Sequence, residues 1–210
     1  ISNTSDLKLI EAFIDKYPDS NLRGIAEARL AELKRIQTAA VPPIQPTIVR
    51  PNRPDANRSD VDNVVYLETK HGRVTILLRP DLAPKHVAQI KALTKSGFYN
   101  GAPFHRVIGG FMAQTGDTKN KNGTGGSDLP NVPAEFTQTP FKRGTVGMAR
   151  SQSPNSANSQ FFICFGDAGF LDRQYTVWGK VTDGMDIVDG IKRGEPVREP
   201  DKIAKMQVAA

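Results

Sequence analysis

FHRVIGGFMAQTGD, residues 104–117, places one arginine, Arg106, among large apolar residues and adds Gln114 as a second polar group. The plainest interpretation is a strand, a bend and a strand, with Arg106 in solvent. The alternative is a hydrogen-bond donor held in an apolar setting. A second stretch favours this alternative: GMARSQSPNSANSQFFICF, residues 147–165, is rich in Ser, Asn and Gly and then becomes strongly apolar.

These two stretches, with GTGG at 123–126 and FLDRQYTVWGKV at 170–181, resemble the cyclophilins, a family of peptidyl-prolyl cis-trans isomerases. The motifs stand in the family's order, and the resemblance runs from about Asn63 to Val208. It implies a mainly β fold: a closed eight-stranded antiparallel barrel capped by two helices. The GTGG stretch lacks the Lys-Ser/Thr ending of a phosphate loop, so we expect a bare loop.

The residue pattern agrees with a β-rich domain at 62–210. Alternation over 64–69 and 74–78 predicts a hairpin, and 80–96 predicts a helix that ends at Gly97. A second short helix is predicted near 185–191, and a last strand over 202–208. Many short strands with two helices suggest a barrel, although the pattern alone leaves barrel and sandwich open.

The first part of the chain has a different pattern. Helical stripes at 7–17 and 22–36, separated by a turn, predict an αα-hairpin over 1–38 that resembles one tetratricopeptide-like unit. One such unit cannot bury its apolar face alone, so we expect it to pack on the β domain, on a second copy in a homodimer or on a partner protein. A helical appendage without a partner is the alternative. Five prolines in 39–61 predict a semi-rigid linker.

The composition limits the classes of function that the protein can have. No run approaches the ~20 apolar residues of a membrane span. The net charge of +6 comes without a Lys/Arg block, so we expect no nucleic-acid partner. The single cysteine, Cys164, excludes an intrachain disulfide and is expected in the core. The three histidines lack metal-ligand spacing, and we expect no cofactor. The bacterial style of MARSQSPNSANSQFF, the Pro-rich linker and the start at Ile1 suggest a periplasmic protein, with the cytoplasm as the alternative.

The chemistry that the resemblance implies needs no covalent step. An Xaa-Pro bond isomerises over roughly 18–20 kcal/mol because amide resonance must be broken. A catalyst must bind the twisted state more tightly than either planar state. In that state the prolyl nitrogen recovers a lone pair, and a fixed guanidinium can donate to it. The resemblance assigns this donor to Arg106, while Gln114 would hold the substrate carbonyl and orient Arg106.

The resemblance implies further site residues of three kinds. The wall of the proline pocket would be formed by Phe111, Met112, Phe162 and Leu171. The bound peptide would be flanked by His105, Ala149, Arg150 and Phe170. A neighbouring pocket, for the residue before Xaa-Pro, would be formed by Gln160 and Ser151.

Three positions depart from the family's usual residues. Arg150 replaces asparagine, Tyr175 replaces a pocket-wall histidine, and Phe170 replaces the tryptophan linked to cyclosporin binding, so we expect weak inhibition by cyclosporin. The predicted function is isomerisation of Xaa-Pro bonds in folding polypeptides. The alternative is a module that binds proline segments, or a chaperone, with little turnover.

Overall fold

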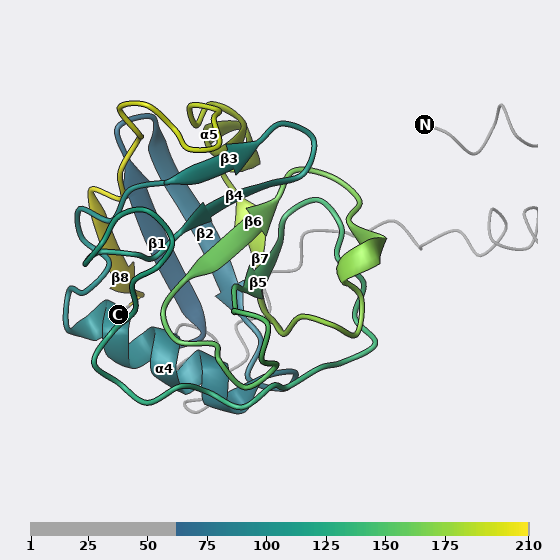
Figure 1. Ribbon diagram of the computed structural model, residues 1–210. Helices are drawn as coiled ribbons and strands as arrows, with labels where there is room; N and C mark the ends of the chain where they lie inside the picture. Colours follow the sequence, from purple (N-terminus) through teal and green to yellow (C-terminus); the bar gives the residue numbers. More distant parts are fainter. Residues whose placement is uncertain (1–61, 210) are drawn as a thin grey trace, which may run out of the picture. The chain divides into compact units, whose positions relative to one another are not determined.

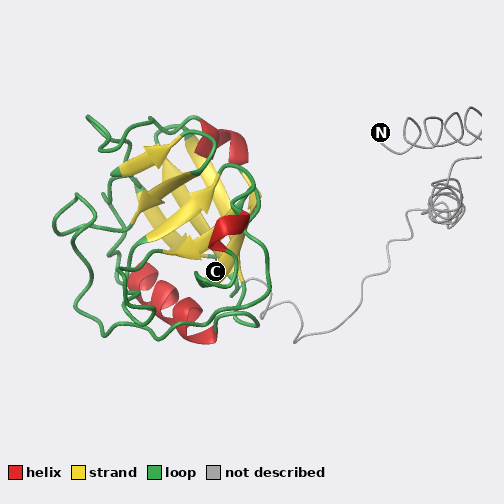
Figure 2. Ribbon diagram, turned by 45° about the vertical axis from the view of Figure 1, so that its right-hand side comes forward, coloured by secondary structure: helices red, strands yellow, loops and turns green. Residues whose placement is uncertain are grey.

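The computed structural model describes residues 62–209, in which a curled antiparallel sheet of eight strands carries a helix at each end (Figures 1 and 2). The strand order is β3-β4-β6-β5-β7-β2-β1-β8. The strands are β1 Val64–Thr69, β2 Gly72–Leu78, β3 Arg106–Ile108, β4 Met112–Thr115, β5 Thr145–Met148, β6 Phe161–Cys164, β7 Val177–Asp183 and β8 Lys205–Val208. The predicted β class and the predicted number of strands are confirmed.

The two helices lie where the residue pattern predicts them. Helix α4, Pro84–Lys95, has Pro84 in its first turn, where the missing N–H costs nothing, and packs His86, Val87, Ile90 and Leu93 inward. Gly97 follows it with a φ of +73°. The short helix α5, Met185–Asp189, lies at the opposite end of the sheet (Figure 1). A single 3-10 turn, η1 at Gly169–Leu171, precedes β7.

The outer strands of the sheet, β3 and β8, approach each other through the segments that precede them. The Phe104 N–H donates to the Asp201 carbonyl at 2.8 Å, and the Ile203 N–H donates to the Ala102 carbonyl at 2.9 Å. These bonds join the two edges without adding a paired strand. The structure therefore has a curled sheet with bridged edges, and full closure of the barrel stays a prediction.

The main core fills the inside of the curl. Trp178 is fully buried, and its ring meets that of Phe161 edge-on at 5.3 Å between centroids. A second cluster lies under β4 and β6 and includes Met112, Phe141, Phe162 and Cys164. Burial raises the pKa of the Cys164 thiol to about 12, so this sulfur is a protonated core atom and no nucleophile.

The helical hairpin predicted at 1–38 and the linker predicted at 39–61 lie outside the described residues. Within 62–209, no helix combines the length and the apolar character that crossing a membrane requires.

Candidate active site

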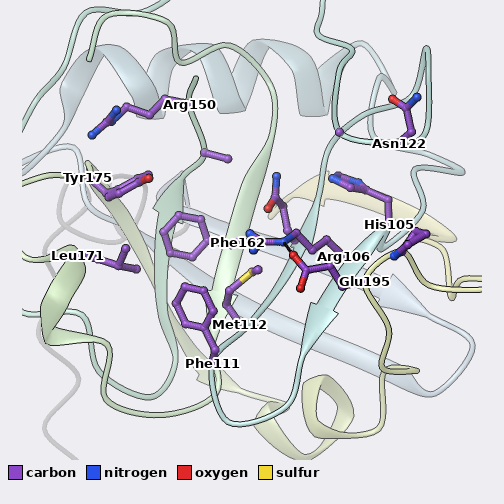
Figure 3. A pocket seen from close by; sticks show the side chains of 14 residues that line it. His105, Arg106, Phe111, Met112, Asn122, Arg150, Phe162, Leu171, Tyr175 and Glu195 are labelled. Atoms are coloured by element: carbon purple, nitrogen blue, oxygen red, sulfur yellow. Dashed lines mark hydrogen bonds and ion pairs between the residues drawn. The ribbon is translucent and has the colours of Figure 1, made fainter. Parts of the chain in front are cut away.

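A pocket of about 560 Å³ opens on the face of the sheet formed by β3, β4 and β6 (Figure 3). It brings together most of the residues singled out from the sequence, although they come from four separate stretches of chain. Its lining includes His105, Arg106, Phe111, Met112, Gln114, Ala149, Arg150, Phe162, Leu171 and Tyr175.

The apolar wall of the pocket is held in place because its aromatic rings pack on one another. Phe162 is almost fully buried and stacks on Phe141 at 5.7 Å, while Tyr175 meets Phe162 edge-on at 5.9 Å. Gly147 makes this stack possible. A Cβ at that position would lie 2.5 Å from Phe141 Cε1 and 2.6 Å from Phe162 Cζ. The space behind the wall therefore has no room for a side chain larger than glycine at this position.

Arg106 lies at the border between this wall and solvent, with 40 % of its side chain exposed. Its neighbour Val107 points into the core, so strand alternation turns Arg106 to the pocket face. The Nε of Arg106 donates to the carboxylate of Glu195, and the guanidinium extends towards Met112 and Phe162 (Figure 3). An arginine held in this place presents its remaining N–H groups beside an apolar slot.

Gln114 is the cross-strand neighbour of Arg106 on β4. Its side-chain amide does not bond to Arg106 in the structure; Gln114 Nε2 donates to Gln160 Oε1 at 2.9 Å. The Gln160 amide in turn donates to the carbonyls of Gly123 and Gly125. The orienting hydrogen bond expected from Gln114 to Arg106 is thus absent here, and the partner of Arg106 is Glu195.

Gln160 and Ser151 lie outside the main pocket and line a neighbouring one of about 200 Å³. Four residues border both pockets: Gln114, Gly123, Ala149 and Arg150. The role expected of Gln160 and Ser151, contact with the residue before Xaa-Pro, stays a prediction.

The loop that carries the GTGG stretch is organised by Asp117. Its carboxylate accepts the backbone N–H groups of Asn120, Asn122, Gly123 and Gly125. Burial alone would raise the pKa of this carboxyl, but the N–H donors outweigh it and lower the pKa to about 2. The loop's N–H donors therefore face the carboxylate of Asp117.

His105 lies beside this loop, and the structure gives no hydrogen-bond partner to either of its ring nitrogens. Burial lowers its pKa, so the ring is neutral near pH 7 and contributes shape rather than charge to the pocket.

Arg150 and Tyr175, which both depart from the family's usual residues, form one unit. The Arg150 guanidinium lies 4.5 Å from the centre of the Tyr175 ring and donates to the carbonyls of Gln174, Ser151 and Gln152. Each residue therefore fixes the other at the rim of the pocket.

Phe170 lies outside the pocket lining. The residue is 65 % exposed, and the centre of its ring is 5.1 Å from that of Phe111. It can extend the apolar wall for a long ligand, but it does not close the pocket.

Sequence reasoning missed four residues that line the main pocket: Asn122, Gly123, Glu195 and Pro196. Gly123 belongs to a motif that had been singled out. Glu195 and Pro196 belong to the segment before β8, which carries no recognisable motif, so their place in the site becomes visible only in the fold.

A curled antiparallel sheet that holds an arginine against an apolar slot has the architecture of a prolyl isomerase. The sequence model of the family described as "Cyclophilin type peptidyl-prolyl cis-trans isomerase/CLD" matches residues 64–208. The chain belongs to this family, and its activity is peptidyl-prolyl cis-trans isomerisation, through which members of the family assist protein folding.

Relatives agree with this assignment. A protein of Brucella suis named probable peptidyl-prolyl cis-trans isomerase is 59 % identical over 170 residues, which cover 74 % of this chain and 87 % of that protein. Peptidyl-prolyl cis-trans isomerase B of Escherichia coli is 38 % identical over 147 residues, 61 % of this chain and 84 % of that one.

Solved structures show the same fold. The crystal structure of a cyclophilin from Hirschia baltica superposes with a TM-score of 0.65 at 33 % identity and covers 71 % of this chain and 74 % of that chain. A cyclophilin-type isomerase of Cryptosporidium parvum, crystallised in the presence of the dipeptide Ala-Pro, gives the same TM-score at 27 % identity, with 70 % and 99 % covered.

Proposed function

We propose that Arg106 catalyses the isomerisation by donating a hydrogen bond to the prolyl nitrogen as the Xaa-Pro bond rotates. The single observation that carries this proposal is the position of its guanidinium beside the apolar wall of the pocket (Figure 3). In the planar states the prolyl nitrogen has no free lone pair, so this bond exists only near the twisted state. A donor of this kind lowers the barrier without stabilising the substrate equally.

The remaining stabilisation comes from holding the proline ring. One charged hydrogen bond contributes about 1.5–3 kcal/mol, which is roughly one to two decades in rate. Five decades of acceleration need about 7 kcal/mol. The apolar wall of the pocket, which includes Phe111, Met112 and Phe162, provides the remaining stabilisation of the twisted state by holding the proline ring while the residue before it rotates.

The other roles follow from the site's polar groups. For Gln114 to hold the substrate carbonyl, its Nε2 must exchange Gln160 for the substrate. Gln160, at the neighbouring pocket, would contact the residue before Xaa-Pro. His105, Ala149 and Arg150 would flank the bound peptide at the pocket rim.

Replacement of Arg106 tests the mechanism. We expect Arg106→Ala to lower kcat/KM for a proline-containing chromogenic peptide by about a hundredfold while peptide binding persists, and Arg106→Lys to restore little, because a lysine lacks the planar fork. Arg79→Ala is the matched control, since Arg79 pairs with Asp81 in the loop that follows β2. Full activity in Arg106→Ala would refute the proposal. A wild type that binds peptide without turnover would favour the proline-binding or chaperone module.

The wider setting is proposed from sequence features. A bacterial, periplasmic protein is supported by the motif style and the Pro-rich linker, and a dimer or partner contact by the apolar stripes in 1–38. Full closure of the barrel is supported by the backbone bonds that join the two sheet edges. Fractionation of cells that express the natural gene decides between periplasm and cytoplasm.

A further inference from the structure

Arg106 has one side-chain partner among the described residues, and that partner is Glu195. The Arg106 Nε donates to a Glu195 carboxylate oxygen, and both side chains line the pocket. Within residues 62–209, the terminal guanidinium nitrogens of Arg106 have no hydrogen-bond partner. The carboxylate therefore holds the guanidinium from one side and leaves the other donors for a substrate.

Glu195 is not a loop residue that happens to be near. The segment that carries it forms antiparallel backbone hydrogen bonds with β3 and with the residue before it. The Gly194 N–H donates to the Val107 carbonyl at 2.9 Å, and the Val107 N–H donates to the Gly194 carbonyl at 2.8 Å. The Val197 N–H donates to the His105 carbonyl at 3.1 Å. This antiparallel register sets Glu195 directly across from Arg106.

The rest of the segment is anchored on both sides. Ile191 and Val197 are buried in the main core, and the Lys192 N–H donates to the buried carboxylate of Asp201 at 2.9 Å. Gly194 has a φ of +155°, and a Cβ there would lie 2.9 Å from the Pro196 carbonyl oxygen, so the turn needs glycine. Glu195 thus stands on a preorganised backbone, which is what a group that must aim another side chain requires.

We infer that Glu195 is a positioning residue of the isomerase: it fixes the Arg106 guanidinium through Nε so that the terminal N–H groups point at the prolyl nitrogen. The inference rests on the proposed role of Arg106. It assigns to the segment before β8 the orienting part expected from Gln114. Because the Glu195 side chain is 55 % exposed, its contribution is that of a partly screened ion pair.

The test separates an effect on the orientation of Arg106 from an effect on peptide binding. NMR exchange spectroscopy on an Xaa-Pro peptide measures the cis-trans rate on the enzyme and the peptide Kd independently. We expect Glu195→Gln, which keeps an acceptor but no charge, to lower the on-enzyme rate about three- to tenfold, with Kd unchanged within about twofold. Glu195→Ala should lower the rate further. Glu199→Gln is the control, because Glu199 is exposed in the same segment and pairs with Lys192.

A direct signature comes from the Arg106 Nε–H resonance. In the wild type we expect it to be shifted downfield and slow to exchange with water, and in Glu195→Gln to move towards the values of free arginines. A merely structural role would lower the melting temperature of Glu195→Gln and leave the rate on the enzyme intact, and that result overturns the inference. If Arg106→Ala keeps full activity, the proposed mechanism fails. If Arg106→Ala is inactive while Glu195→Gln and Glu195→Ala both match the wild type, only the role of Glu195 fails.

Discussion

Gly147→Ala tests whether the stacked wall determines both stability and binding. The added methyl group would lie 2.5 Å from Phe141 Cε1 and 2.6 Å from Phe162 Cζ, whereas carbon atoms pack at about 3.5–4.0 Å. Both rings must therefore move by about 1 Å, or the backbone of Gly147 must shift away from them. Both are buried, and Phe162 is paired across the sheet with Gly147 itself. Overpacking of this kind costs about 1–3 kcal/mol, which is roughly 2–12 °C in Tm for a domain of this size.

The same displacement pushes Phe162 towards the pocket, so the peptide Kd should weaken several-fold. Thermal unfolding followed by near-UV circular dichroism measures the first effect, and peptide titration measures the second. Gly109→Ala is the matched control, since the nearest atom to its added Cβ is Arg193 Nε at 3.8 Å. A Gly147→Ala protein with the wild-type Tm and Kd would refute the account of the wall.

Three further outcomes follow from the site. The pKa of Asp117 is about 2 in the folded protein and about 3.9 in the unfolded chain, so the ionised carboxylate adds roughly 2 kcal/mol to the free energy of unfolding above about pH 5. This contribution is lost as the pH falls from about 4 to 2. Urea unfolding across this range should show the loss in the wild type but not in Asp117→Asn. Tyr175→Phe should keep activity within about twofold because the ring carries the contact with Arg150, whereas Tyr175→Ala should lower kcat/KM about fivefold or more in the peptide assay. Cyclosporin should inhibit the wild type weakly and Phe170→Trp at least tenfold more strongly, as measured by inhibition titration; nanomolar inhibition of the wild type would contradict the expectation of weak inhibition.

The parts of the site that could be predicted lie in continuous motifs. Arg106 and Met112 are a few residues apart on paired strands, so a short stretch of sequence records both of them. The buried alternation of β1 and the Gly97 stop after α4 were equally local signals. The identity of the family then placed the rest of the wall, including Phe162.

The parts that could not be predicted depend on pairing between distant segments. Glu195 is 89 residues from Arg106 along the chain, and only the register of its segment against β3 brings the two together. Gln114 shows that closeness on the sheet does not determine a hydrogen-bond partner. Its expected partner, Arg106, is its cross-strand neighbour, but its amide donates to Gln160 instead. Side-chain direction at a polar site depends on which acceptor lies nearest, and sequence spacing does not record it.

The burial of the single sulfhydryl has a practical consequence. Cys164 is fully enclosed and its pKa is about 12, so maleimide reagents should leave it untouched in the native protein. A cysteine introduced on the surface near the pocket can then be labelled selectively with a fluorophore, without first removing the natural one. Reaction of Cys164 itself would in turn count the molecules whose sheet has opened.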